Sequence, residues 1–453
     1  MSLKSPTLET PFKLAHLNLP RDLGDGLVLR LATVDDTEPL AQFTGRVFGR
    51  EQFDELAATY TRDTMRPTHP VIGPGNTLIV EDTRAQKIAS STILIPQTWT
   101  YAGIPFGVGR PEMVATDPAY RRRGLVRVQF DVLHALSDAL GHLAQSITGI
   151  PWYYRQFGYE YALDLSGGRT AYFSNIPALK ENETEPYRLR EMTCADIPFV
   201  AVLYERDCAR SLVTCPRPEW LWRYLLDADP AHRAWRIPAQ IIETPAGRAV
   251  GYVQPTRDIW MDASVVDEFA VSEGQSVRAV LPSVLRWLKP HAETEASRQK
   301  KLVTGITFAF GREHPVFDAA SDLLPKVRPP YGWYIRVPDV PRLLRAIAPA
   351  LEMRLARSVV AGFSGELKIS EYRSGYKLGF ENGKLGNVET WQPTPEESGD
   401  CSFPPLVFLQ LLFGAKSLSE LRAQFPDVWA KDEPAVLVNA LFPKMYSCVV
   451  PVG

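Results

Sequence analysis

Long apolar runs, a secretory leader and paired cysteines are all lacking in this sequence of 453 residues. No stretch reaches the roughly 18 consecutive apolar residues that a membrane-spanning helix needs. The N-terminus shows no apolar core of a signal peptide, so a cytoplasmic protein is expected. The five cysteines form no Cys-x-x-Cys pair and have no histidine at ligand spacing, which argues against a metal site and a disulfide framework.

An excess of charge of either sign is also lacking. The chain carries 50 Lys and Arg against 52 Asp and Glu, a net charge of −2 at pH 7. Proteins dedicated to nucleic acids are usually basic, so no nucleic-acid partner is expected. With 45% hydrophobic and 23% charged residues the composition is that of a globular protein, and the length predicts two to four domains.

A basic cluster with a glycine stands between an expected strand and an expected helix. Asp117-Pro118 predicts a turn, residues 121–123 are all arginine, and Gly124 follows them. Apolar residues at three- and four-residue spacing predict a helix over 125–140, which Gly141 ends. A helix N-terminus after a glycine favours anions, and arginines can hold phosphate oxygens. The alternative is a basic loop ahead of an ordinary surface helix.

A second apolar strand is expected over 143–147, and Gly149-Ile-Pro-Trp-Tyr-Tyr-Arg-Gln-Phe-Gly-Tyr159 follows it. This order resembles the acetyl-CoA site of the GNAT acyltransferase superfamily, with Gln/Arg-x-x-Gly-x-Gly/Ala and then a Tyr before a Gly-Phe or Gly-Tyr pair. Arg121-x-x-Gly124 fits, whereas Val126 stands where Gly or Ala is usual. With Arg-Arg-Arg-Gly and Tyr-x-x-Phe-Gly-Tyr, the pattern is similar to the enhanced intracellular survival (Eis) branch of N-acetyltransferases.

An internal repeat indicates a second copy of the same fold. Leu189, Arg190, Thr193 and Asp196 have the same spacing as Leu29, Arg30, Thr33 and Asp36. Residues 267–272 align in the same way with residues 111–116, so that Glu268 stands where Glu112 stands in the first copy, and a helix over 277–288 is expected next. The second copy has neither the arginine cluster nor the tyrosine, and is therefore expected to have lost the cofactor site.

The resemblance and the repeat together imply a mixed α+β and α/β fold. It consists of tandem GNAT domains, the second degenerate, followed by a sterol-carrier-protein-like α+β domain. The expected ranges are an N-terminal arm over 1–25, the GNAT domain with the acetyl-CoA site over 26–170, the degenerate GNAT-like domain over 171–332 and the sterol-carrier-like domain over 333–453. In the first domain, strands are expected over 78–80 and over 88–95, ending at Pro96. In the third, Asn382-Gly383 predicts a hairpin.

The resemblance also implies which residues contact acetyl-CoA. The backbone of the strand before the turn would pair with the pantetheine arm as an added strand does. The arginine loop and the start of the helix would hold the pyrophosphate, with Arg121 as a possible solvated flank. The implied contacts are Val114, Ala115, Thr116, Arg122, Arg123, Gly124, Leu125, Val126, Arg127, Gly149 and Ile150.

Acetyl transfer to an amine needs an acid for the departing thiolate and a base for the amine proton. The resemblance implies Tyr154 as the acid, and the alternative is that its ring only packs against other aromatic residues. Tyr153 and Tyr159 are interpreted as packing residues. It implies the C-terminal carboxylate of Gly453 as the base, although family members usually end in an aromatic residue. The alternative for Gly453 is a frayed terminus without a catalytic role. Glu112 is the alternative base, and the alternative for Glu112 is an ordinary solvent-facing carboxylate on a strand.

The other titratable residues near this stretch, His134 and His142, lie on the expected helix and are interpreted as surface or core residues. The resemblance thus implies an acetyl-CoA-dependent N-acetyltransferase that transfers the acetyl group directly in a ternary complex. The acceptor would be an amine of an aminoglycoside-like polyamine or a lysine, and the protein a homo-oligomer, such as a hexamer. The alternatives are an acyl group longer than acetyl and a non-catalytic protein that binds acyl-CoA or an apolar ligand.

Overall fold

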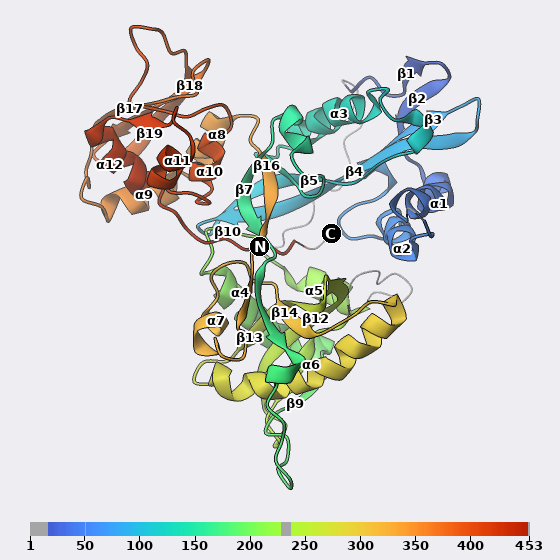
Figure 1. Cartoon of the computed structure of the whole chain (residues 1–453). Helices are drawn as coiled ribbons and strands as arrows, with labels where there is room; N and C mark the ends of the chain where they lie inside the picture. The colour runs from blue at the N-terminus through green and yellow to red at the C-terminus, as the bar shows by residue number, and fades with distance from the viewer. Residues whose placement is uncertain (1–16, 50, 228–236, 452–453) are drawn as a thin grey trace.

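The structure is a computed structural model, and it describes residues 17–49, 51–227 and 237–451. Three β-sheets with their helices make up the molecule (Figure 1). The first and second sheets lie one above the other, and the third sheet with its helices lies to one side of the first. In these described ranges no helix combines the length and the apolar character required to cross a membrane.

The first sheet has the order β1-β2-β3-β4-β5-β6-β16-β7, with β10 added beside β4. Successive side chains of β3 point to opposite faces, because a strand repeats every two residues. Leu78 and Val80 therefore pack with helix α3, while Ile79 packs with helix α1 on the other face. The elements are β1 (Arg21–Gly24), β2 (Leu27–Leu31), α1 (Thr37–Phe48), α2 (Glu55–Thr64), β3 (Thr77–Asp82), β4 (Lys87–Tyr101), β5 (Ile104–Thr116), α3 (Leu125–Ala139), β6 (Ala144–Ile147), β7 (Glu160–Leu165), β10 (Val213–Thr214) and β16 (Tyr331–Arg336).

The second sheet has the order β15-β8-β14-β13-β12-β11-β9, which repeats the order of the first sheet from β7 to β2. In both sheets one parallel pair, β5 with β6 and β13 with β14, is flanked by antiparallel pairs. The elements are β8 (Gly168–Tyr172), β9 (Arg188–Glu191), α4 (Ile197–Cys208), α5 (Glu219–Asp227), β11 (Gln240–Glu243), β12 (Ala249–Trp260), β13 (Ala263–Val271), α6 (Val277–Gln299), β14 (Gly305–Phe308), α7 (Pro315–Ala319) and β15 (Lys326–Arg328).

The repeat seen in the sequence is a repeat of hydrogen bonds in the structure. Arg30 binds both carboxylate oxygens of Asp36, at 2.7 and 2.8 Å, and Arg190 binds Asp196 at the same two distances. In each copy the aspartate also accepts from the backbone and side chain of a threonine, which starts the following helix with a capping box. The two halves therefore begin with the same local structure.

The two sheets exchange one strand across the expected domain boundaries. β8 follows β7 in the chain but pairs with β14 and β15 of the second sheet. β16 follows β15 but pairs with β6 and β7 of the first sheet. The predicted limits at residues 170 and 332 thus lie within β8 and β16, and no pattern in the sequence indicates this exchange.

The third sheet has the order β19-β18-β17-β20-β21, and its hairpin between β18 and β19 turns at Asn382-Gly383 as predicted. Both turn residues have positive φ, 49° and 78°, which this turn type requires. The elements are α8 (Val340–Ala346), α9 (Ala348–Ala356), β17 (Gly365–Ser370), β18 (Gly375–Glu381), β19 (Lys384–Trp391), β20 (Cys401–Ser402), α10 (Phe408–Leu412), α11 (Leu418–Gln424), β21 (Trp429–Ala430) and α12 (Asp432–Leu441).

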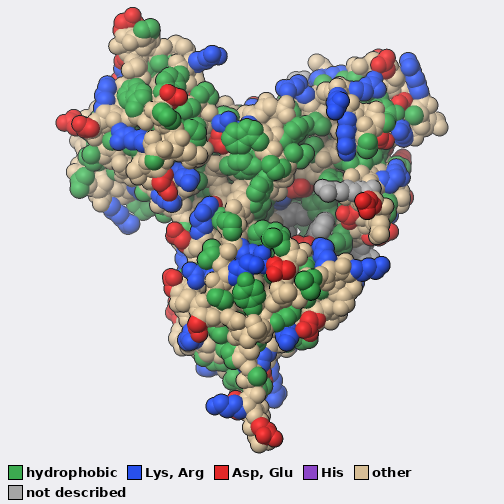
Figure 2. Space-filling view, viewed as in Figure 1, with side chains coloured by type: hydrophobic (Ala, Val, Ile, Leu, Met, Phe, Trp, Pro, Cys, Tyr) green, Lys and Arg blue, Asp and Glu red, His purple; other side chains and the backbone are tan. Residues whose placement is uncertain are grey.

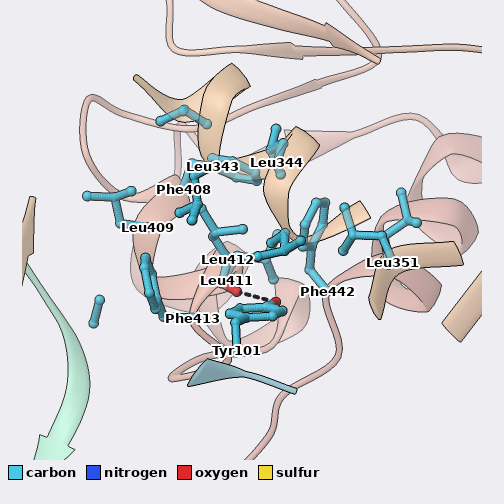
Figure 3. Packing of buried hydrophobic residues seen from close by; sticks show 14 of the residues in the cluster. Tyr101, Leu343, Leu344, Leu351, Phe408, Leu409, Leu411, Leu412, Phe413 and Phe442 are labelled. Carbon is cyan, nitrogen blue, oxygen red and sulfur yellow. Dashed lines mark hydrogen bonds between the residues drawn. The ribbon is translucent and has the colours of Figure 1, made fainter. Parts of the chain in front are cut away.

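The third sheet and its helices share one hydrophobic core with the far end of the first sheet. The ring of Tyr101, at the end of β4, is buried among helices α8 to α12, and its hydroxyl donates to the Leu412 carbonyl at 2.8 Å (Figure 3). Arg354 of α9 donates in turn to the Tyr101 hydroxyl at 3.1 Å and to the Leu441 carbonyl at 2.8 Å. These contacts attach the third unit to the first sheet through buried groups.

Three local predictions were wrong in extent. β4 does not end at Pro96 but continues to Tyr101, because the pairing with β3 stops at Ile93 and the missing N–H of the proline faces an edge without a described strand. Helix α6 continues to Gln299, past two prolines. Of the expected arm, residues 1–16 lie outside the described residues, and Arg21–Gly24 form the unpredicted strand β1.

Candidate functional site

The site begins where β5 separates from β6. In the described chain these strands pair only at Val108 and Gly109, so the part of β5 that follows Gly109 has a free edge on this side. On the other side the register with β4 slips between Glu112 and Ala115, and Met113 has a positive φ of 50°. This bulge turns the free edge outward, and unpaired backbone groups of an open strand can bind an extended ligand.

The arginine loop after β5 curls its backbone toward this opening. Arg122 and Gly124 both have positive φ, 63° and 75°, between residues of ordinary conformation. Gly124 is the N-cap of the fifteen-residue helix α3, whose first amides have no intrahelical partner. Alternating backbone conformations of this kind direct successive N–H groups to one point, which together with the helix dipole attracts an anion.

A cavity of about 720 Å³ lies between the free edge of β5 and this loop. It brings together nine of the eleven residues for which the resemblance implied acetyl-CoA contacts, and Arg121 lines it as well. The nine are Val114, Ala115, Thr116, Arg122, Gly124, Leu125, Val126, Arg127 and Ile150. Val47 and Phe48 of α1 and the aromatic residues Tyr120, Tyr153 and Phe157 complete its wall.

The other two implied contacts lie beside the cavity and bind protein groups. Arg123 donates to Asp25 at 2.9 Å and lies over the ring of Tyr120. The Gly149 carbonyl accepts from the Tyr331 hydroxyl at 2.6 Å. Neither residue lines the cavity in this structure, and their contact with acetyl-CoA stays a prediction.

Tyr154 lies on a short 3-10 helix, Tyr153–Phe157, directly behind the cavity wall. Its ring is buried against Phe130 of α3, at 5.8 Å, and Tyr334 of β16, at 5.5 Å. Burial first, and then the Glu112 carboxylate, raise the pKa of Tyr154 above its ordinary value. The phenol is therefore kept protonated at neutral pH, which is the form that an acid requires.

The neighbouring tyrosine and histidines are core residues, as interpreted from the sequence. The Tyr159 hydroxyl is 3.0 Å from Nε2 of His134, and burial lowers the pKa of His134 to about 3. His142 is buried with Nδ1 2.9 Å from the Ser137 hydroxyl, and burial lowers its pKa to about 4. Both imidazoles are therefore neutral and held by side chains of the protein interior.

A second cavity, of about 420 Å³, lies on the other side of the bulge, between the first and second sheets. The surface is hollowed in this region between the upper and lower parts of the molecule (Figure 2). The first half contributes Glu112, Met113 and Thr148, and Tyr60 from α2. The second half contributes Thr256, Asp258, Asp267 and Ala309. Three carboxylates thus face this space, and Glu112 is paired with Arg110 at 2.9 Å.

The C-terminal segment runs along the seam between the two halves into this second cavity. The Tyr446 carbonyl accepts a hydrogen bond from the Leu212 amide, and Cys448 forms an isolated parallel β-bridge with Asp164 of β7. The Trp333 indole donates to the Val449 carbonyl at 3.3 Å. Residues 449–451 then line the cavity. Gly453 itself lies outside the described residues.

The sequence did not identify the tyrosines of β16 as part of the site. Tyr331 and Tyr334 donate to the carbonyls of Gly149 and Ile150, at 2.6 and 3.3 Å, and hold the loop that closes the first cavity. They reach it only because β16 belongs to the first sheet. The aromatic run at residues 331–334 was the signal in the sequence, and the predicted limit at residue 332 divided it between the second and third units.

Comparison with known proteins agrees with this geometry. Residues 28–162 match a family described as an acetyltransferase (GNAT) domain. A comparison with curated protein sequences gives no match. The structure is similar to a GCN5-related N-acetyltransferase from Anabaena variabilis, with 16% identity and a TM-score of 0.60, over 93% of this chain and 99% of that one. It is also similar to one from Kribbella flavida, with 17% identity and a TM-score of 0.56, over 93% and 97% of the two chains.

Another similar structure is that of Eis1 from Mycobacterium abscessus, with 16% identity and a TM-score of 0.57 over 93% of this chain and 98% of that one. At such identities the likeness shows a shared fold, while activity has to be argued from the site. The family match covers the strands, the arginine loop and the tyrosine that form the first cavity. Residues 28–162 are therefore similar to GNAT acetyltransferase domains in sequence, and the described chain has a similar fold to the N-acetyltransferases named above.

Proposed function

We propose that the chain is an acetyl-CoA-dependent N-acetyltransferase that transfers the acetyl group directly to an amine in a ternary complex. One observation carries the proposal: the two cavities lie on opposite sides of the β5 bulge and adjoin at residues 112–114. A thioester bound along Val114 would have its carbonyl at this junction. An amine in the second cavity could then attack it without a covalent enzyme intermediate.

In this proposal the arginine loop and the first amides of α3 hold the pyrophosphate, with Arg122 and Arg127 as the charged contacts. The free backbone of Val114, Ala115 and Thr116 binds the pantetheine arm as an added strand. A long coenzyme A thioester fits this cavity of about 720 Å³ better than a compact anion does. One part of the wall offers strand backbone for the pantetheine arm, and another part offers the arginine loop for the pyrophosphate.

Tyr154 is proposed as the acid that protonates the departing thiolate. The base is a carboxylate in the second cavity, where two candidates remain. Residues 449–451 line this space, which makes the C-terminal carboxylate of Gly453 one candidate, and Glu112, which also lines it and pairs with Arg110, is the other. Proton removal by either group would make the amine nucleophilic at the junction.

The acceptor is proposed to be cationic, such as an aminoglycoside-like polyamine or a lysine side chain. Glu112, Asp258 and Asp267 face the second cavity, and carboxylates attract protonated amines. The third unit is proposed to be the sterol-carrier-like domain; its core is filled by side chains such as Phe403 and Phe408, so its role is to support the first sheet. The protein is also proposed to be a homo-oligomer, such as a hexamer, and a measurement of its mass in solution would test this.

The test is thiol release from acetyl-CoA with a panel of spermidine, kanamycin and a lysine peptide, repeated with propionyl- and octanoyl-CoA. The intact chain is compared with Tyr154→Phe, Glu112→Gln and a chain carrying one residue added after Gly453. Turnover that is lost in Tyr154→Phe and in the extended chain supports the terminal carboxylate as the base. Loss in Glu112→Gln with an active extended chain moves the base to Glu112.

If acetyl-CoA binds but no amine of the panel is acetylated, the proposal is wrong and the chain is a non-catalytic acyl-CoA-binding protein. A preference for octanoyl-CoA over acetyl-CoA would keep the enzyme and correct the donor. These outcomes are separable, because binding is measured by titration in the absence of an amine.

A further inference from the structure

One hydroxyl of the second half holds a helix of the first half. Tyr224, on α5, donates from its phenol to Oδ2 of Asp63 on α2 at 2.7 Å. Arg66, just after α2, donates to Oδ1 of Asp63 and, at 3.3 Å, to the Tyr224 hydroxyl oxygen. Helix α2 belongs to the first half of the molecule and helix α5 to the second half (Figure 1). The contact is therefore a link between the halves.

Asp63 is itself fixed by its surroundings. The side chain of Asp63 is 13% exposed, and that of His69 is only 1% exposed, with Nε2 4.0 Å from Oδ2 of Asp63. The backbone amides of Val71 and Ile72 donate to Nδ1 of His69, which leaves the ring proton on Nε2, on the side of Asp63. The His69 ring also packs edge-on against Tyr224 at 5.1 Å. A largely buried carboxylate with several donors fixes the position of the helix that carries it.

The helix held in this way forms part of the second cavity. Tyr60 lies one turn before Asp63 on the same face of α2, and it lines the cavity opposite the carboxylates. The helix also carries α1 with it, through the buried hydroxyls of Thr44 and Thr61 at 2.7 Å and the ion pair of Glu38 with Arg62. Movement of α2 would therefore change the second cavity directly through Tyr60, and the first cavity only through α1, whose Val47 and Phe48 line its wall.

We propose that Tyr224 is a positioning residue for the acceptor: from the half that has lost its cofactor loop, it holds α2, and with it Tyr60, in the place that shapes the acceptor cavity. This inference rests on the proposed function, because it assigns the second cavity to the amine. It gives the second GNAT-like half a role in choosing the acceptor, whereas the donor is bound by the first half alone.

The experiment compares the intact chain with Tyr224→Phe, which keeps the ring and removes the hydroxyl. Tyr204→Phe is the control, because the buried Tyr204 hydroxyl donates to the Cys215 carbonyl at 2.6 Å, next to β10, and this hydrogen bond does not involve α2. Hydrogen exchange of the amides of residues 55–64 is measured without substrates. The KM values for kanamycin and for acetyl-CoA and the kcat are then measured for each variant.

The expected result for Tyr224→Phe is exchange of residues 55–64 that is about three- to tenfold faster. The KM for kanamycin should rise by about the same factor, the usual effect of one hydrogen bond, while kcat and the KM for acetyl-CoA change less than about twofold. Tyr204→Phe should lower the midpoint of unfolding, but it should not raise the KM for kanamycin more than the KM for acetyl-CoA.

Unchanged exchange of residues 55–64 in Tyr224→Phe would overturn the proposal. So would equal increases of both KM values in the two variants, because that pattern describes a general loss of stability. If the intact chain acetylates no amine, the proposed function fails at that point. The exchange measurement still decides whether Tyr224 holds α2, since it needs no turnover.

Discussion

Arg217 and Glu268 form a buried ion pair with two hydrogen bonds, at 2.6 and 3.2 Å, in the centre of the second half. The guanidinium lies between the rings of Tyr204 and Trp222, at 4.4 and 4.1 Å, and Tyr252 donates to the same carboxylate. Glu268 aligns in sequence with Glu112, which faces the second cavity of the first half. The same position thus holds a cavity carboxylate in one copy and a core ion pair in the other.

The first prediction concerns this pair. Arg217→Ala should lower the free energy of unfolding by about 3–5 kcal/mol, because it leaves the Glu268 carboxylate buried without its cation. Urea unfolding followed by fluorescence measures the change. Arg223→Ala on α5, which removes an exposed ion pair with Glu219, is the control and should cost less than about 1 kcal/mol. Equal losses in the two variants would contradict the interpretation.

The second prediction concerns the proposed acid. Tyr154→Phe should lower kcat by about 100-fold or more, the usual contribution of a positioned acid, and leave acetyl-CoA binding nearly unchanged. Because burial and Glu112 raise the pKa of Tyr154, the phenol stays protonated through its ordinary titration range. The kcat of the intact enzyme should therefore not fall near pH 10. A fall near pH 10 that is absent in Tyr154→Phe would show that the phenol keeps its ordinary pKa, against this prediction.

The third prediction separates two adjacent arginines. Arg122 lines the first cavity and forms no ion pair with any described residue, whereas Arg123 is bound to Asp25. Arg122→Ala should raise the Kd for acetyl-CoA about tenfold, since it removes a charged contact to phosphate, and Arg123→Ala should change it less than about threefold. Isothermal titration gives both values. The effect of Arg122→Ala should shrink at high salt; a larger effect at Arg123 would reverse the assignment.

The fourth prediction concerns pH and stability. Burial lowers the pKa of His142 from 6.5 to about 4, so between these values the unfolded chain binds a proton that the folded chain does not. Stability should therefore fall as the pH is lowered from about 6.5 to 4, by about 3 kcal/mol from this residue. His142→Gln should flatten the pH dependence in that window. An unchanged slope would mean that other groups cause the loss, such as His69, whose pKa burial also lowers to about 4.

Local signals in the sequence predicted local structure well. The Asn382-Gly383 turn and the glycine before α3 each act within a few residues, and each is found in the structure as predicted. Most of the cavity of the arginine loop follows from them, because its walls come mainly from residues 114–127 and the loop that follows β6, with Val47 and Phe48 of α1 added from a distant segment.

The rest of the site depends on contacts between distant segments. Tyr331 reaches Gly149 across 182 positions, and the second cavity joins Tyr60 with Asp258 and Val450. No spacing rule connects such residues, since their proximity results from the exchange of β8 and β16 and from the path of the C-terminal segment. The same long-range pairing explains why the predicted ends of domains and of β4 were wrong.

The exchange of β8 and β16 also has a consequence for synthesis of the protein. The first sheet cannot be completed until residue 336 has left the ribosome, although its other main strands are finished by residue 165. Between these points the gap between β6 and β7 exposes unpaired strand edges, which are prone to wrong pairing. A fragment that ends before β16 therefore lacks the strand that joins β6 to β7, and a fragment that begins after β8 lacks the strand that joins β14 to β15.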